Sequence, residues 1–127
     1  MEIATIIVML ALAEYIFFTA RVGISRGKLG VKAPACTGNE QFERMFRVQQ
    51  NTLEQLIVFV PATFAFAYFV NNFWVIVPGA IFVIGRLVYS NGYINSPAGR
   101  APGMIASMLA NVAMVIGTLG MLVWGMI

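Results

Sequence analysis

The chain is 127 residues long, 60% hydrophobic and only 10% charged, with a mean hydropathy of +0.84. Soluble domains carry about a quarter charged residues, so this composition excludes a water-soluble globular protein and a disordered chain. The formal charge of +3 reflects eight Lys and Arg residues scattered among long apolar runs. Nucleic-acid binding needs a basic stripe on a solvated face, so we predict a protein of the bilayer with no nucleic-acid partner.

Four hydrophobic stretches cover most of the chain, at about residues 3–24, 44–70, 73–95 and 102–127. One membrane-crossing helix needs about 20 apolar residues, so we predict an all-α integral membrane four-helix bundle with a single domain over residues 1–127. The start imitates a signal peptide at Ala11-Leu12-Ala13. Its first residues are not basic and the apolar run continues past that point, so we interpret it as a retained first helix.

Three connections separate the stretches, and their charges predict an orientation. The first runs from Ser25 to Phe42 and contains the helix breakers Gly27, Gly30, Pro34 and Gly38; the second is the turn Asn71-Asn72, and the third is residues 95–103. The positive charges of these connections lie in the first and third, at Arg26, Lys28, Lys32 and Arg100. By the positive-inside rule these two loops face the cytoplasm, and with four crossings both termini lie on the opposite side.

Cys36 is the only cysteine, and the chain has no histidine. This excludes an internal disulfide and a thiolate metal cluster, and we predict no metal site. Cys36 lies in the first loop, outside every group of candidate site residues. We interpret it as a bystander thiol, with an oxidation or alkylation sensor as the alternative.

Five charged residues fall within the predicted helices and away from the loops: Glu14, Arg21, Arg47, Glu54 and Arg86. A charge in hydrocarbon costs about 2.5 kcal/mol or more, so each is a candidate functional residue. Glu14 and Arg21 are seven residues apart and share one helix face. A purely structural role is the alternative for these two residues: Arg21 extends to the membrane interface, and Glu14 forms a buried hydrogen bond to another helix.

In the second helix, Arg47, Asn51 and Glu54 follow an i, i+4, i+7 spacing that places them within an arc of about 60°. A simple ion pair between Arg47 and Glu54, within the helix or between subunits, is the competing interpretation. The third helix repeats the geometry with Arg86, Tyr89 and Tyr93, although tyrosines near a helix end also serve as membrane-interface anchors.

Together these residues, with Arg26 and Arg100, predict a polar pocket near the cytoplasmic interface. Four guanidiniums against one carboxylate make a pocket that attracts anions. A ligand with two carboxylates and one ammonium matches its charges, and a phosphate or an anionic lipid headgroup is the competing ligand.

These residues resemble the MAPEG superfamily, the membrane-associated proteins in eicosanoid and glutathione metabolism. The resemblance is carried by three blocks: Phe42-Glu43-Arg44 with Arg47, Asn51 and Glu54, in the pattern F-E-R-x-x-R-x-x-x-N-x-x-E; residues 85–93; and Arg100-Ala101-Pro102. It implies a homotrimer that binds glutathione between subunits near the cytoplasmic face. The matching glutathione-binding positions are Arg26, Arg47, Gln49, Asn51, Glu54, Arg86, Tyr89 and Tyr93. Arg100 matches the catalytic arginine that stabilises the glutathione thiolate.

The departures from the family pattern narrow the expected chemistry. Gln55 stands where the leukotriene-forming member has a tyrosine, which puts that contact in doubt. Tyr89 replaces a histidine, and Met104 a catalytic arginine, of the prostaglandin-forming member, and both differences argue against prostaglandin isomerase chemistry.

The sequence therefore predicts a membrane-bound glutathione transferase, with glutathione as co-substrate and a second, peroxidase activity. Its other substrates are hydrophobic electrophiles or lipid hydroperoxides dissolved in the bilayer. A non-enzymatic lipid-binding scaffold is the alternative. A channel or transporter is disfavoured, because residues 55–70 and 73–85 contain no charge and such proteins place polar residues through the depth of the membrane.

Overall fold

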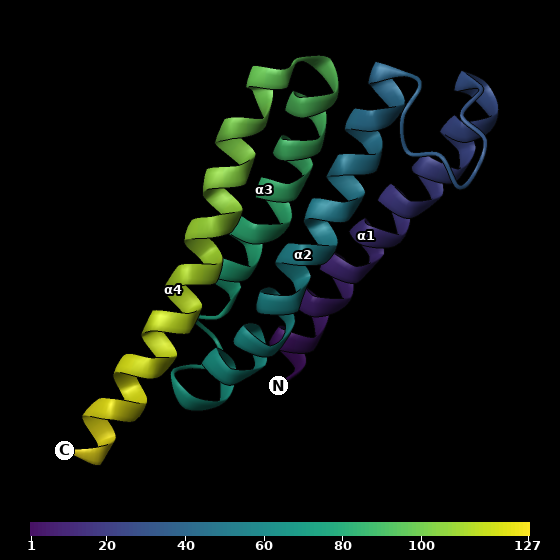
Figure 1. The fold of residues 1–127 in the computed structure, drawn as a ribbon. Helices are drawn as coiled ribbons and strands as arrows, with labels where there is room; N and C mark the ends of the chain where they lie inside the picture. Colours follow the sequence, from purple (N-terminus) through teal and green to yellow (C-terminus); the bar gives the residue numbers. More distant parts are fainter.

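The computed structural model describes all residues from Met1 to Ile127 and contains four long α-helices. These are α1 (Glu2–Leu29), α2 (Glu40–Phe69), α3 (Ile76–Asn95) and α4 (Ala101–Met126), with the short 3-10 helix η1 (Pro97–Arg100) before α4. Figure 1 shows the helices side by side, with the α1–α2 and α3–α4 connections at one end of the bundle. The α2–α3 turn and both termini lie at the other end. The predicted all-α class and the order of four helices are confirmed.

Three of the helical segments are long and apolar enough to cross a membrane: α1, α2 and the η1–α4 segment from Pro97 to Met126. The shorter helix α3 does not reach the same hydropathy, because its second half contains polar residues. Two of them, Arg86 and Ser90, are buried within the bundle. The outer surface remains strongly apolar, with side chains such as Ile16, Ile57 and Leu109 about two-thirds exposed. A surface of this kind suits an integral membrane protein.

The first two helices extend further into the first loop than the hydropathy pattern predicts. Helix α1 continues to Leu29, through the expected breaker Gly27, and ends where Gly30 adopts a left-handed conformation (φ 72°) with its N–H bonded to the Arg26 carbonyl. Helix α2 starts at Glu40, because the Asn39 side chain accepts a hydrogen bond from the Phe42 N–H at 3.0 Å. Both ends are set by capping, which overrides a boundary drawn from hydropathy.

Helix α3 begins at Ile76, three residues later than predicted. The Asn71 side-chain oxygen accepts hydrogen bonds from the N–H groups of Phe73 and Trp74, both at 2.8 Å. This local arrangement holds residues 72–75 in a turn. Asparagine commonly stabilises turns in this way.

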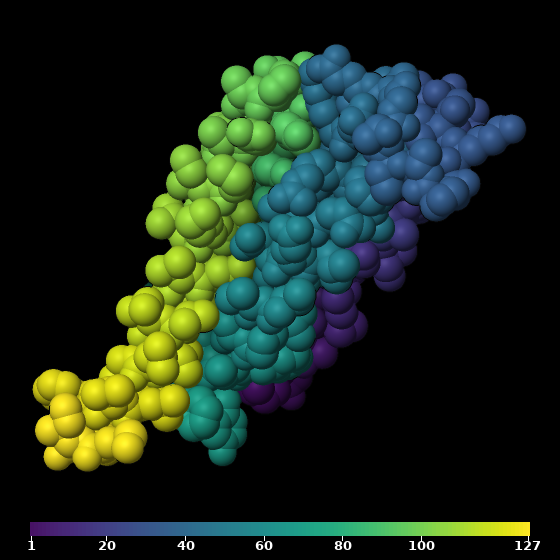
Figure 2. Space-filling model, in the orientation of Figure 1, coloured from purple at the N-terminus to yellow at the C-terminus, as the bar shows by residue number.

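Helix α3 packs closely on η1 and on α4, because glycines lie along both contacts. A Cβ on Gly103 would lie 2.2 Å from the Tyr89 nitrogen, and one on Gly92 would lie 2.1 Å from the Gly99 oxygen. Gly79 of α3 packs against Ile7 of α1, whereas Gly120 of α4 faces open space. The C-terminal end of α4 is exposed and projects beyond the other helices, as the space-filling view in Figure 2 shows.

The main apolar core lies towards the end of the bundle that holds the termini. Its centre is the stacked pair Phe59 and Phe82, whose ring centroids are 3.8 Å apart. Nearer the other end, Phe18, Val48 and Tyr89 form a second small core that joins α1, α2 and α3. Helices α1 and α4 do not touch, so α2 and α3 form the centre of the bundle. Most of the candidate site residues lie on these two helices, with Arg26 on α1 and Arg100 in η1.

Candidate functional site

The polar stripe of α2 forms an ion pair within the single chain. The Arg47 Nη1 donates to Glu54 Oε1 at 3.2 Å across two helical turns. Both side chains are about half exposed, at 51% and 53%. This is the ion pair that the sequence offers as the competing interpretation, and it places both charges on an accessible face of the bundle.

Arg86 connects this stripe to α3. Its side chain is completely buried, yet its Nη1 donates a 2.7 Å hydrogen bond to Asn51 Oδ1. The polar faces of α2 and α3 therefore meet inside one chain. Asn51 stands between the buried Arg86 and the accessible Arg47–Glu54 pair, so the polar groups are continuous from the interior to the surface.

A column of two stacked aromatic rings between two cations continues from Arg86 towards the third connection. The Arg86 guanidinium lies 4.2 Å from the centroid of the Tyr89 ring, and Tyr89 stacks on Tyr93 with centroids 5.7 Å apart. The Arg100 guanidinium lies 6.0 Å from the Tyr93 centroid and is exposed. Each cation faces the electron-rich side of a ring, which is an attractive arrangement. The i, i+3, i+7 spacing correctly predicts that these α3 side chains share a face.

Two of the predicted site residues make other contacts in the single chain. The Arg26 Nη1 donates to the Ala35 carbonyl at 2.7 Å, and its guanidinium lies 4.9 Å from the centroid of the Phe42 ring. Gln49 donates to the Thr19 hydroxyl at 3.3 Å. Arg26 and Gln49 therefore link α1 to the first loop and to α2, and they do not contact the Arg86 column.

The charged residues of α1 behave differently from the sequence-based expectation. Arg21 does not extend to the membrane interface: its Nη1 donates to the Ser90 hydroxyl on α3 at 2.8 Å. The expected helix-to-helix hydrogen bond of Glu14 is wrong, because both carboxylate oxygens are buried without a hydrogen-bond partner. Glu14 lies in the interior of the bundle, and no donor of a neighbouring helix is within hydrogen-bonding distance of its carboxylate.

Sequence reasoning missed two residues that link the helices of the site. Ser90 receives the Arg21 hydrogen bond, and Arg44 donates to the carbonyl of Ile94 at the end of α3. Ser90 could have been found, since it follows Arg86 by four residues and shares its face. Arg44 lies within the F-E-R block, but its partner could not be predicted, because every residue has a backbone carbonyl and the sequence does not show which one an arginine contacts.

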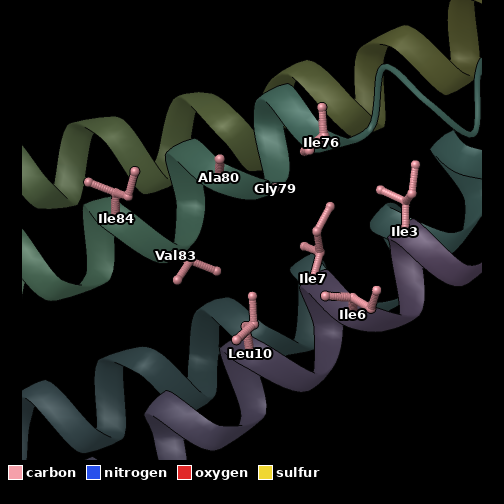
Figure 3. Close-up of a pocket in the computed structure, with 9 residues that line it drawn as sticks. All are labelled: Ile3, Ile6, Ile7, Leu10, Ile76, Gly79, Ala80, Val83 and Ile84. Atoms are coloured by element: carbon pink, nitrogen blue, oxygen red, sulfur yellow. The ribbon is translucent and has the colours of Figure 1, made fainter.

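Two apolar grooves open on the outside of the bundle. One, of about 360 Å³, lies between α1 and α3, where Ile7, Leu10 and Val83 face each other across the space (Figure 3). A larger one of about 610 Å³ lies along α3 and α4 and includes Phe66 and Trp74. Their lining is almost entirely hydrophobic, so they suit lipid chains or other apolar molecules and not a polar ligand.

The bundle and its apolar surface define an integral membrane protein, with a column of arginine and tyrosine side chains near one end. The chain belongs to the MAPEG family, whose model matches residues 4–120. It is 39% identical over 119 residues to an uncharacterised protein of Synechocystis, covering 94% of this chain and 87% of the relative.

Two kinds of enzyme are also similar. Human microsomal glutathione S-transferase 2 is 30% identical over 112 residues, which cover 87% of this chain and 76% of that protein. Rat leukotriene C4 synthase is 30% identical over 108 residues, covering 84% of this chain and 72% of that protein. The resemblance that the sequence suggested is therefore confirmed at the level of the family.

Proposed function

We propose that this protein is a membrane-bound glutathione transferase that conjugates hydrophobic electrophiles, with reduction of lipid hydroperoxides as a second reaction. The observation that carries the proposal is the column from Arg86 through Tyr89 and Tyr93 to Arg100, joined to α2 by the Arg86–Asn51 hydrogen bond. The names of the similar glutathione S-transferases support it.

The charges of the pocket suit glutathione, which carries two carboxylates and one ammonium. Arginines bind carboxylates through paired, charge-assisted hydrogen bonds, and Glu54 offers the anion for the ammonium. The stacked tyrosines add hydroxyl donors. The residues that we propose to hold glutathione are Arg26, Arg47, Gln49, Asn51, Glu54, Arg86, Tyr89 and Tyr93.

Arg100 is the proposed catalytic residue. A free thiol has a pKa of about 8.5 and reacts as its anion. A neighbouring guanidinium therefore increases the fraction of glutathione that is present as the reactive thiolate at neutral pH. The start of α4 lies directly after Arg100, and the positive end of a helix dipole favours the same anion. In conjugation the thiolate sulfur forms a bond to carbon and the leaving group departs with its electron pair. In the second reaction two glutathiones become a disulfide while the hydroperoxide becomes an alcohol and water.

We further propose that the protein is a homotrimer in which a neighbouring subunit completes each pocket. Two observations support this arrangement: the Arg47–Glu54 pair faces outwards, and Arg26 points away from the column of its own chain. In the proposed topology α3 also crosses the membrane. The two basic connections then face the cytoplasm and both termini lie opposite.

The conjugation assay tests the catalytic proposal. Membranes or nanodiscs that carry the protein should conjugate glutathione to a reactive chloro-nitroarene with release of chloride. Arg100→Ala should lower the rate on the order of 100-fold, in the range of one lost charge-stabilising donor, and should change glutathione affinity much less. Lys32→Ala removes an exposed cation from the first connection and serves as the matched control.

Two results would contradict the proposed activity. A folded assembly that converts no electrophile and no hydroperoxide is not this enzyme. Glutathione binding should raise the melting temperature by linkage. If millimolar glutathione leaves that temperature unchanged as well, the lipid-binding scaffold becomes the better interpretation.

A further inference from the structure

A buried polar layer crosses the bundle between α1, α2 and α3, directly below the small core of Phe18, Val48 and Tyr89. Glu14 precedes Phe18 by one helical turn, and Thr52 follows Val48 by one turn. Arg86 precedes Tyr89 by three residues. Because α1 and α3 run opposite to α2 and those three apolar residues pack together, the polar residues lie at one level of the bundle.

The opposite side of this layer is closed by the main apolar core. One further turn along each helix brings Ala11, Leu56 and Phe82, all of which belong to that core. The three polar side chains are therefore enclosed between two apolar layers. Glu14 is 8% exposed, and Thr52 and Arg86 are 0% exposed.

The polar atoms in this layer have unused and complementary hydrogen-bonding capacity. Both carboxylate oxygens of Glu14 lack a partner, and so do the Nε and Nη2 of Arg86. Glu14 therefore has two free acceptor oxygens and Arg86 has two free donor nitrogens, which is the set that a carboxylate and a guanidinium use in bidentate pairing. Either charge alone would be strongly unfavourable in this enclosed position.

Arg21 is the other arginine close in sequence to Glu14, and its Nε and Nη2 also lack a partner. However, it is only partly buried and lies about two helical turns further along α1. It donates to Ser90 on α3, and its guanidinium lies over the rings of Phe17 and Phe18. Arg86 is the arginine that lies at the level of Glu14.

We propose that Glu14 is the buried counter-ion of Arg86 and acts as a positioning residue for the polar pocket. It compensates the charge on the inner side of the guanidinium, which leaves Nη1 directed at Asn51 on the outer side. The part of this proposal that concerns ligand binding rests on the proposed glutathione site. The pairing itself does not, because it follows from the enclosed layer.

A double-mutant cycle without ligand tests the pairing. Thermal unfolding is measured in nanodiscs for the wild type, Glu14→Gln, Arg86→Met and the double variant. Glu14→Gln should lower the melting temperature of the wild type and leave that of Arg86→Met unchanged or higher, because removing one member of a buried ion pair strands the other. Equal decreases in both backgrounds would overturn the pairing.

Two further backgrounds keep this test decisive. Arg86→Lys retains the positive charge, so Glu14→Gln should still lower its melting temperature, and this background also serves if Arg86→Met does not fold. Arg21→Met is the matched control, because it removes a partly buried arginine of α1. Glu14→Gln should destabilise it as much as it destabilises the wild type, and loss of the effect there would assign the counter-ion role to Arg21 instead.

Glutathione titration tests the positioning role. Glu14→Gln should weaken glutathione binding on the order of tenfold, a coupling of the size found between contacting residues. It should raise KM while kcat at saturating glutathione stays near the wild-type value, and Glu14→Asp should restore part of the affinity. Unchanged affinity in Glu14→Gln would refute positioning. If the wild type itself binds no glutathione, the proposed function fails, and the unfolding cycle still decides the ion pair.

Discussion

Gly103→Ala should disrupt the contact between α3 and α4 and thereby displace the proposed catalytic arginine. A Cβ at this position would lie 2.2 Å from the Tyr89 nitrogen and 2.4 Å from the Gly85 carbonyl oxygen. Ordinary contacts begin at 3.4 Å, so the two helices must separate by about 1 Å. The opposing atoms belong to the backbone, so no change of side-chain rotamer can relieve the overlap.

The expected cost is at the upper end of what overpacking causes. Added methyl groups in tight cores cost about 1–3 kcal/mol, and an overlap with backbone places this one near 3 kcal/mol. For a chain of this length that corresponds to a fall in Tm of roughly 10 °C. Gly103 also follows Arg100 by three residues, and a displacement of about 1 Å near a reacting group costs on the order of 100-fold in rate.

Thermal unfolding in nanodiscs and the conjugation rate measure the two effects separately. Gly23→Ala is the matched control, because Gly23 lies inside α1 with no atom within 4 Å of the added Cβ. That variant should be as stable as the wild type or up to about 1 kcal/mol more stable, since alanine favours helix. If Gly103→Ala unfolds at the wild-type temperature and retains full activity, the reasoning from the close α3–α4 contact is wrong.

Three other predictions follow from the geometry. Asn51→Ala leaves a buried Arg86 donor without its acceptor and should destabilise the fold by about 2 kcal/mol in denaturant unfolding. The control Asn91→Ala changes an exposed asparagine and should stay within about 0.5 kcal/mol of the wild type. Equal stability of the two variants would contradict the role of Asn51 as the acceptor for Arg86. Asn39→Ala removes the α2 cap and should cost about 1 kcal/mol, whereas no change in unfolding would mean that the cap does not stabilise the helix. Cys36 is an exposed thiol in the first connection and should react with an impermeant maleimide only from the cytoplasmic side of oriented vesicles. Cys36→Ser is the unlabelled control. Labelling from the other side would reverse the proposed orientation.

Periodicity predicted the parts of this molecule that depend on helix geometry alone. The four helices follow from long apolar runs, which admit no other structure in a bilayer. The shared face of Arg86, Tyr89 and Tyr93 follows from about 100° of rotation per residue, and the structure places these side chains in one column. Such features need no knowledge of the neighbouring helices.

Features that depend on capping or on packing between helices could not be predicted in the same way. The left-handed Gly30 that ends α1 was expected only as one of several breakers, and the pattern gave no reason to prefer it over Gly27. The burial of Glu14 required the relative depth of three helices. The contacts of Arg26 with loop carbonyls depend on the path of the first loop, which hydropathy does not describe.

The accessible Arg47–Glu54 pair has a consequence for ligand selectivity. Because each charge already has its opposite, a simple anion gains little at Arg47 and a simple cation gains little at Glu54. An exposed pair of this kind contributes only about 0–1 kcal/mol, so a ligand that supplies both an acid and an amine can open it and form two ion pairs in place of one. The exchange leaves the net charge of the pair unchanged. This part of the surface should therefore favour zwitterions, and binding there should depend only weakly on ionic strength.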